Sequence, residues 1–153
     1  MAIFSVKRFR FFARTKQSNQ DLKPDHETNR LPGMPCPGDK PDNASTAATL
    51  FRGPEKYNCA QAILRTFQKC FSVRDEEIIA ARAMGHGKVP GGVCGALYAG
   101  QWLLNDERKA EELTRNFRSL AGSSKCKKIL KLKHLSCKEC VALTARLLDG
   151  YLN

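Results

Sequence analysis

The chain has 153 residues, of which 42% are hydrophobic, and its formal net charge is +11. This length accommodates one ordinary domain with a hydrophobic core. The longest apolar runs are far shorter than the ~20 residues that a transmembrane helix needs, and the basic, aromatic N-terminus lacks the apolar stretch of a secretory signal. We therefore expect a cytoplasmic protein without a transmembrane segment.

The first part of the sequence is typical of a flexible arm. Residues 1–17 are basic, and the stretch 18–45 contains Pro24, Pro32, Pro35, Pro37 and Pro41, which interrupt helix and strand pairing. We expect an arm or linker over 1–45 and a helical, cysteine-bearing domain over 46–153. Cys36 lies within the arm and is interpreted as a free loop thiol.

Every segment after the arm has helical periodicity. Apolar residues at i, i+3 and i+4 spacing follow Gly53-Pro54, where proline occupies a favoured first helical position. Asp106 is a candidate cap, and Ser136 with Glu139 forms a capping-box pattern. The predicted helices cover 44–52, 53–71, 75–84, 93–104, 107–120, a short lysine-rich segment capped by Ser123 or Ser124, and 137–152. Because alternating β-branched runs are missing, we predict an all-α, compact multi-helix bundle.

Several of the seven cysteines fall at or near predicted helix starts. Cys94, Cys126 and Cys137 are in first turns, and Cys59 is one turn further in. Unpaired backbone N–H groups and the helix dipole favour a thiolate there, so we expect lowered cysteine pKa values. Cys70 is interpreted as a small buried hydrophobe.

Two sequence patterns next to these cysteines bear on their chemistry. Cys137-Lys138-Glu139-Cys140 suits a redox dithiol or half of a metal site, which His134 could join. The glycine-rich stretch 85–92 does not match a phosphate-binding loop, because the required Gly-Lys-Ser/Thr order is absent. Its glycines, Gly91 and Gly92 together with Gly95 of the following segment, are expected to shape the loop around Cys94.

The cysteine pattern resembles the family of redox-active proteins labelled C_GCAxxG_C_C. The resemblance is carried by Asn58-Cys59-Ala60-Gln61-Ala62, Gly92-Val93-Cys94-Gly95-Ala96, Gly122-Ser123-Ser124-Lys125-Cys126 and Cys137-Lys138-Glu139-Cys140-Val141. It covers about 44–150 and implies a helical bacterial or archaeal protein.

The resemblance implies that Cys59, Cys94, Cys126 and Cys137 are the working residues, as catalytic thiols or as metal ligands. This chain departs from the pattern in two places. Ala99 stands where a glycine is expected, with Gly100 next. Cys140 stands where the family usually has an apolar residue, so it is an added ligand, a resolving thiol or a tolerated replacement.

Three functions remain open at this point. The first is thiol redox chemistry with an unidentified redox partner protein, in which Cys94 attacks and Cys59, Cys126 or Cys137 is its partner. The second is an iron–sulfur cluster or zinc site formed by the same four cysteines. Covalent haem is not expected, because no Cys-x-x-Cys-His is present. The third, disfavoured, is binding of nucleic acid or an acidic partner by the basic blocks. The sequence does not distinguish an oxidoreductase from an electron carrier. It also does not determine the oligomeric state.

Overall fold

The computed structural model describes residues 42–152. Within this range the chain forms α-helices, turns and short 3-10 helices, and its β-type pairings are isolated bridges rather than strands. The predicted all-α class is therefore confirmed. Most of the expected arm, residues 1–41, lies outside the described residues.

The helices follow one another with short connections. The first half contains α1 (Asn43–Leu50), α2 (Cys59–Thr66), α3 (Gln68–Phe71), α4 (Asp75–Ala80) and a 3-10 helix over Ala81–Met84. The second half contains a 3-10 helix over Pro90–Gly92, then α5 (Gly95–Leu104), α6 (Glu107–Ala121), α7 (Cys126–Leu132) and α8 (Cys137–Asp149).

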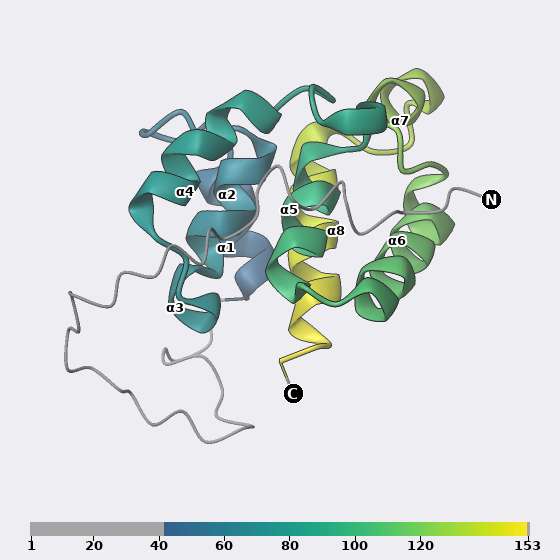
Figure 1. Ribbon diagram of the computed structural model, residues 1–153. Helices are drawn as coiled ribbons and strands as arrows, with labels where there is room; N and C mark the ends of the chain where they lie inside the picture. Colours follow the sequence, from purple (N-terminus) through teal and green to yellow (C-terminus); the bar gives the residue numbers. More distant parts are fainter. Residues whose placement is uncertain (1–41, 153) are drawn as a thin grey trace, which may run out of the picture. The chain divides into compact units, whose positions relative to one another are not determined.

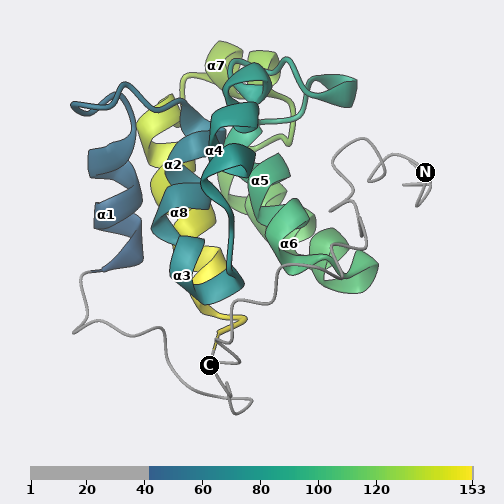
Figure 2. The same ribbon diagram turned by 60° about the vertical axis from the view of Figure 1, so that its left-hand side comes forward.

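Helices α5 and α8 lie at the centre of the bundle (Figures 1 and 2). Helix α5 packs against α2, α6 and α8, and α8 also packs against α1, α2 and α6. The apolar faces predicted from periodicity meet in this core, where burial of apolar area stabilises the fold. Its largest fully buried apolar side chains are Phe67, Phe117, Ile63, Leu64, Leu97, Leu113, Ile129, Leu148 and Val141.

Two predicted helix caps are confirmed. The Asp106 side chain accepts a hydrogen bond from the Lys109 backbone N–H at 3.0 Å. Ser136 and Glu139 cap α8 reciprocally, because each side chain accepts from the backbone N–H of the other residue, at 3.2 and 2.6 Å. These side chains satisfy N–H groups that the helix itself leaves unpaired.

The helix predicted over 53–71 begins later than expected. Residues 53–58 form a turn in which the Arg52 N–H donates to the Tyr57 carbonyl at 2.9 Å. Arg52 and Lys56 both have a φ of +53°, which is incompatible with a right-handed helix. Helix α2 consequently starts at Cys59, and a non-helical Phe67 separates it from α3.

Two other helix starts also differ from prediction. Helix α7 begins at Cys126 with Lys125 at the cap position, and the Ser123 hydroxyl instead accepts from the Lys125 N–H at 3.1 Å. Helix α5 begins at Gly95 rather than Val93, with Cys94 as its cap residue. In both places a tertiary pairing holds the preceding residues extended, since Val93 and Lys125 form an antiparallel bridge.

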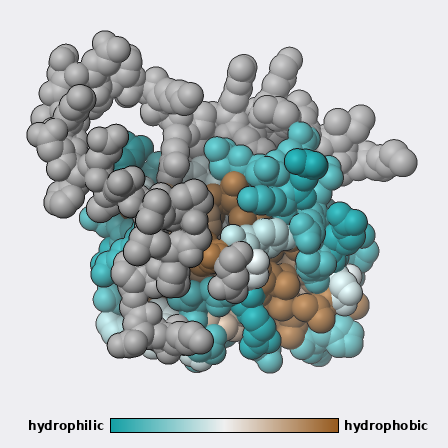
Figure 3. Space-filling model, turned by 90° about the horizontal axis from the view of Figure 1, so that it is seen from below, coloured by the Kyte–Doolittle hydropathy of each residue, from teal (hydrophilic) through white to brown (hydrophobic). Residues whose placement is uncertain are grey.

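The described surface is mixed in polarity. Figure 3 shows one face, on which hydrophilic residues surround a smaller apolar area. No helix within residues 42–152 has the length and apolar character needed to cross a membrane.

Leu97 provides a test of the core. It is 0% exposed in α5, whereas Leu120 in α6 is 61% exposed. Leu97→Ala should lower the free energy of unfolding by about 2–5 kcal/mol, because it leaves a cavity in a close-packed core. Leu120→Ala is the control and should change it by no more than about 0.5 kcal/mol. Urea unfolding followed by circular dichroism measures both, and equal effects would contradict the described packing.

Candidate functional site

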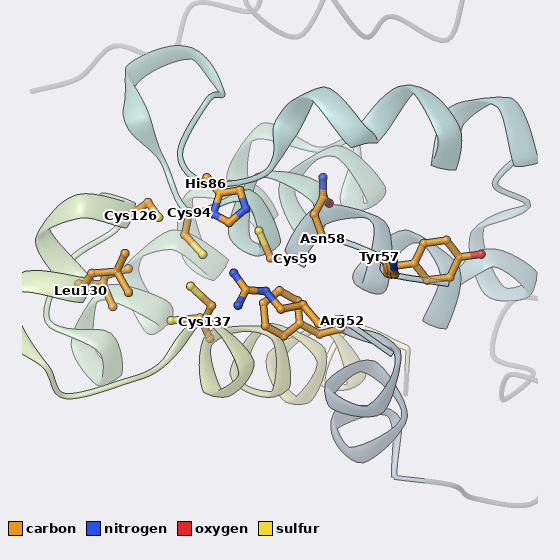
Figure 4. Close-up of a pocket in the computed structure, with 13 residues that line it drawn as sticks. Arg52, Tyr57, Asn58, Cys59, His86, Cys94, Cys126, Leu130 and Cys137 are labelled. Atoms are coloured by element: carbon orange, nitrogen blue, oxygen red, sulfur yellow. The ribbon is translucent and has the colours of Figure 1, made fainter. Parts of the chain in front are cut away.

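Five cysteines line one cavity of about 100 Å³. All five are free thiols: Cys59, Cys94, Cys126, Cys137 and Cys140. Figure 4 shows the labelled cysteines pointing toward the same space from different helices. The fold thus brings together the four cysteines selected from the sequence and adds the one whose role was left open.

Four of these cysteines occupy helix N-termini. Cys59, Cys126 and Cys137 are the first residues of α2, α7 and α8, and Cys94 is the cap residue of α5. The expectation that Cys59 lies one turn inside its helix was wrong, because α2 begins at Cys59. The starts of four helices therefore meet at the cavity.

Asn58 and Gln61 position Cys59 at the start of α2. The Asn58 side chain accepts from the Gln61 N–H at 2.9 Å, and the Gln61 side chain accepts from the Asn58 N–H at 3.2 Å. The Asn58 amide also donates to the carbonyls of Ala81 and Arg82, at 3.1 and 3.0 Å. The Asn-Cys-Ala-Gln sequence is thus a capping box that also ties α2 to the 3-10 segment after α4.

Gly95 allows α5 to approach α2 closely. A Cβ atom at this position would lie 2.7 Å from the Cys59 Sγ and 2.6 Å from the Met84 carbonyl oxygen. Both distances are shorter than carbon, oxygen and sulfur atoms tolerate without movement. Glycine directly after Cys94 is therefore required for Cys59 and Cys94 to share the cavity.

The loop before Cys94 is joined to the segment before Cys126. The Cys94 N–H donates to the Ser124 carbonyl at 2.8 Å, and the Lys125 ammonium donates to the Gly91 carbonyl. These bonds connect residues about thirty positions apart and bring Cys126 to the cavity.

Three glycines of the same loop adopt backbone conformations that favour glycine. Gly91 and Gly92 have φ values of +77° and +67°, as expected for glycines that shape this loop. Gly87, which the sequence did not single out, has a φ of +71°, and a Cβ there would lie 2.9 Å from the Cys126 Cβ.

Burial holds the inner thiols in the neutral form. Desolvation is the largest cause that raises the pKa of Cys59 and of Cys126, each to about 11. The His86 backbone N–H donates toward the Cys59 sulfur. This hydrogen bond lowers the Cys59 pKa, but it offsets only part of the rise caused by desolvation. The pKa of Cys94 is raised well above its usual value by a hydrogen bond with the Cys140 side chain and by burial.

The prediction of lowered pKa values was therefore wrong for Cys59, Cys94 and Cys126. A helix N-terminus contributes about 0.3–1 kcal/mol toward a negative charge. A rise of the Cys59 pKa from 9 to about 11 corresponds to roughly 3 kcal/mol, so desolvation outweighs the dipole. The expected role of Cys94 as the attacking thiolate stays a prediction, although its 5% exposure limits direct access by a partner's disulfide. Cys137 is half-buried and is the most accessible of the five.

Cationic and apolar side chains complete the cavity wall. Phe51, Arg52, Lys56, His86 and Leu130 also line it, and the Arg52 guanidinium lies over the Phe51 ring at 5.3 Å. None of the ion pairs within residues 42–152 involves Arg52. Sequence reasoning missed these residues, because turns with positive φ at Arg52, Lys56 and His86 bring them to the cavity.

Other candidate residues lie elsewhere. His134 is exposed and does not line the cavity. Cys70 is half-buried in α3 and is disulfide-bonded, so its interpretation as a small buried hydrophobe was wrong. Cys36 lies outside the described residues.

The cysteines fit a metal by chemistry but not by placement. Thiolate sulfur is a suitable ligand for zinc and for iron–sulfur clusters. However, among residues 42–152 no three His, Cys, Asp or Glu side chains are placed so that they could hold a metal ion. A preformed site for a single metal ion therefore does not fit the described arrangement.

Residues 57–151 match the family described as "Putative redox-active protein (C_GCAxxG_C_C)". The chain belongs to this family. The match covers more than half of the chain, includes all five cavity cysteines and confirms the resemblance seen in the sequence. Comparisons with curated proteins and with solved structures find no match.

Gly95 provides a test of the cavity geometry. Gly95→Ala should lower the free energy of unfolding by about 1–3 kcal/mol, because the added methyl group overlaps the Met84 carbonyl and the Cys59 sulfur. Gly150→Ala is the control, since its nearest atom would be 3.3 Å away and its φ is −62°. Chemical denaturation measures both variants, and a Gly95→Ala protein as stable as the control would contradict the close approach of α5 to α2.

The raised pKa values predict how thiol labelling depends on pH. Because thiolate is the reactive form, alkylation of Cys59 and Cys126 should be slow at neutral pH. It should accelerate about tenfold per pH unit until the pH approaches the pKa of about 11. Peptide-resolved mass spectrometry after timed iodoacetamide treatment measures each rate. A labelling midpoint below pH 8 at either residue would show that its thiol is not held neutral by burial.

Proposed function

We propose that this family member is a thiol–disulfide redox protein whose cavity cysteines exchange electrons with the disulfide of a partner protein. The observation that supports this function is the convergence of five free thiols on one cavity, four of them at helix N-termini. Thiols that share a cavity can form a disulfide with small movements, whereas dispersed thiols cannot.

The reaction begins at the accessible thiol. Deprotonated Cys137 attacks one sulfur of the partner's disulfide, which forms a mixed disulfide and releases one partner thiolate. A second cavity thiol, after losing its proton, attacks the Cys137 sulfur. This step closes a disulfide within the cavity and releases the second partner thiolate. Two electrons and two protons pass from the cavity thiols to the partner, and the reverse sequence oxidises the partner.

The surface beside the cavity favours an acidic partner. Lys127, Lys128 and Lys131 are exposed on α7, and Leu130, which lines the cavity, is 48% exposed. A positive rim attracts a negative surface and speeds encounter. An apolar side chain within that rim supplies contact area once the partner is bound.

Anaerobic purification followed by thiol counting tests the proposed function. The protein should contain no stoichiometric iron or zinc, and oxidised glutathione should remove cavity thiols in pairs. Stoichiometric metal that is lost in Cys94→Ser would instead support the cluster or zinc alternative and contradict the proposal.

The role of Cys137 is tested in the same assay. Cys137→Ser should slow the loss of cavity thiols at least about tenfold, because the remaining thiols are buried. His134→Ala, three residues away and outside the cavity, is the control and should react like the unaltered protein. An unchanged rate in Cys137→Ser would mean that another thiol makes the first attack.

A further inference from the structure

Cys140 is placed differently from the other cavity cysteines. It lies in the first turn of α8, three residues after Cys137, and is 3% exposed. It lines the same cavity as Cys94, and its side chain is the largest cause of the raised pKa of Cys94. It thus connects the accessible start of α8 with the buried start of α5.

We propose that Cys140 is the resolving thiol of this protein, and that the oxidised state carries a Cys94–Cys140 disulfide inside the cavity. This inference rests on the proposed thiol–disulfide function and deepens it, since it names the pair. The sequence left Cys140 open between an added ligand, a resolving thiol and a tolerated replacement.

The placement of the two side chains supports the pair. Both thiols line one cavity of about 100 Å³, so a small movement can bring their sulfur atoms to the ~2.05 Å of a disulfide. Cys94 caps α5 and Cys140 lies in α8, and these two central helices pack directly against one another. The bond would therefore join elements that are already held together.

Helix geometry explains how Cys140 reaches the first thiol. Residues three positions apart lie on the same side of an α-helix, so Cys137 and Cys140 are neighbours on α8. Cys140 can attack the Cys137 sulfur of a mixed disulfide, which releases the partner's second thiolate and forms a Cys137–Cys140 disulfide.

A second exchange moves the disulfide inward. The Cys94 thiolate attacks the Cys140 sulfur, which forms the Cys94–Cys140 bond and releases Cys137 as a thiolate that takes up the proton lost by Cys94. The backbone N–H groups of Ala96 and Leu97 donate toward the Cys94 sulfur and stabilise its charge during the attack. No further oxidant is consumed, because the partner's disulfide has already accepted the two electrons.

Burial would protect the Cys94–Cys140 disulfide from reductants in solution. Cys94 is 5% exposed and Cys140 is 3% exposed, so their disulfide is shielded from soluble reductants. Cys137 becomes a free thiol again at the rim. Reduction of the protein must then pass back through Cys137.

Disulfide mapping of the full chain tests the pair directly. After oxidation with oxidised glutathione, non-reducing digestion at acidic pH and mass spectrometry should identify a Cys94–Cys140 linkage as the main product. Cys59→Ala is the matched control and should keep this linkage, because both of its sulfurs remain. A final product that links Cys137 to Cys140, or Cys94 to Cys59, would overturn the proposal.

Cys140→Ala tests the resolving role. Its first exchange with oxidised glutathione should proceed at the normal rate, but the glutathione adduct on Cys137 should decay at least about tenfold more slowly. Cys140→Val gives the same readout if the alanine variant does not fold.

The outcomes separate this inference from the proposed function. An adduct that resolves normally in the folded Cys140 variants would overturn the role of Cys140 and leave the function standing. Failure of the unaltered protein to form either an adduct or a cavity disulfide would overturn both.

Discussion

The close approach of α5 to α2 at Gly95 is the contact on which the cavity depends. A side chain there would overlap the Met84 carbonyl and the Cys59 sulfur, so glycine lets the two helix starts meet. Asn58 holds the other side of the contact, because it caps α2 and also binds the 3-10 segment that ends at Met84. The Cys94 loop and α7 are then added through backbone bonds, which bring Cys126 to the same space.

This arrangement sets two electrostatic effects against each other. Four helix N-termini favour negative charge at the cavity, but packing them together removes water from the thiols. Desolvation is the larger effect, so Cys59, Cys94 and Cys126 are kept neutral. Under the proposed function, the chemistry of such a cavity begins at an accessible thiol on its rim. Cys137 occupies that place.

The chain belongs to a redox-active family, and thiol chemistry at the described cavity is the function that we propose for it. Cys140 adds a fifth cysteine to the four of the family pattern and lines the same cavity as Cys94. Arg52 and Lys56 line the same cavity, and exposed lysines lie on α7. The proposed electron exchange with a partner protein would use the accessible thiol and the buried thiols of this cavity.

The sequence by itself determined the all-helical class, the caps at Asp106 and Ser136, and the positions of Cys94, Cys126 and Cys137 at or near helix starts, whereas Cys59 was selected mainly through the family resemblance. These features depend on local periodicity and on side chains that bond to their own helix, which neighbouring residues reveal. Tertiary structure decided where α2 begins, which cationic residues border the cavity, the direction of the cysteine pKa shifts and the shared cavity of Cys94 and Cys140. Each of these depends on burial or on contacts between residues far apart in the chain. Local sequence patterns do not predict burial or long-range contacts of this kind.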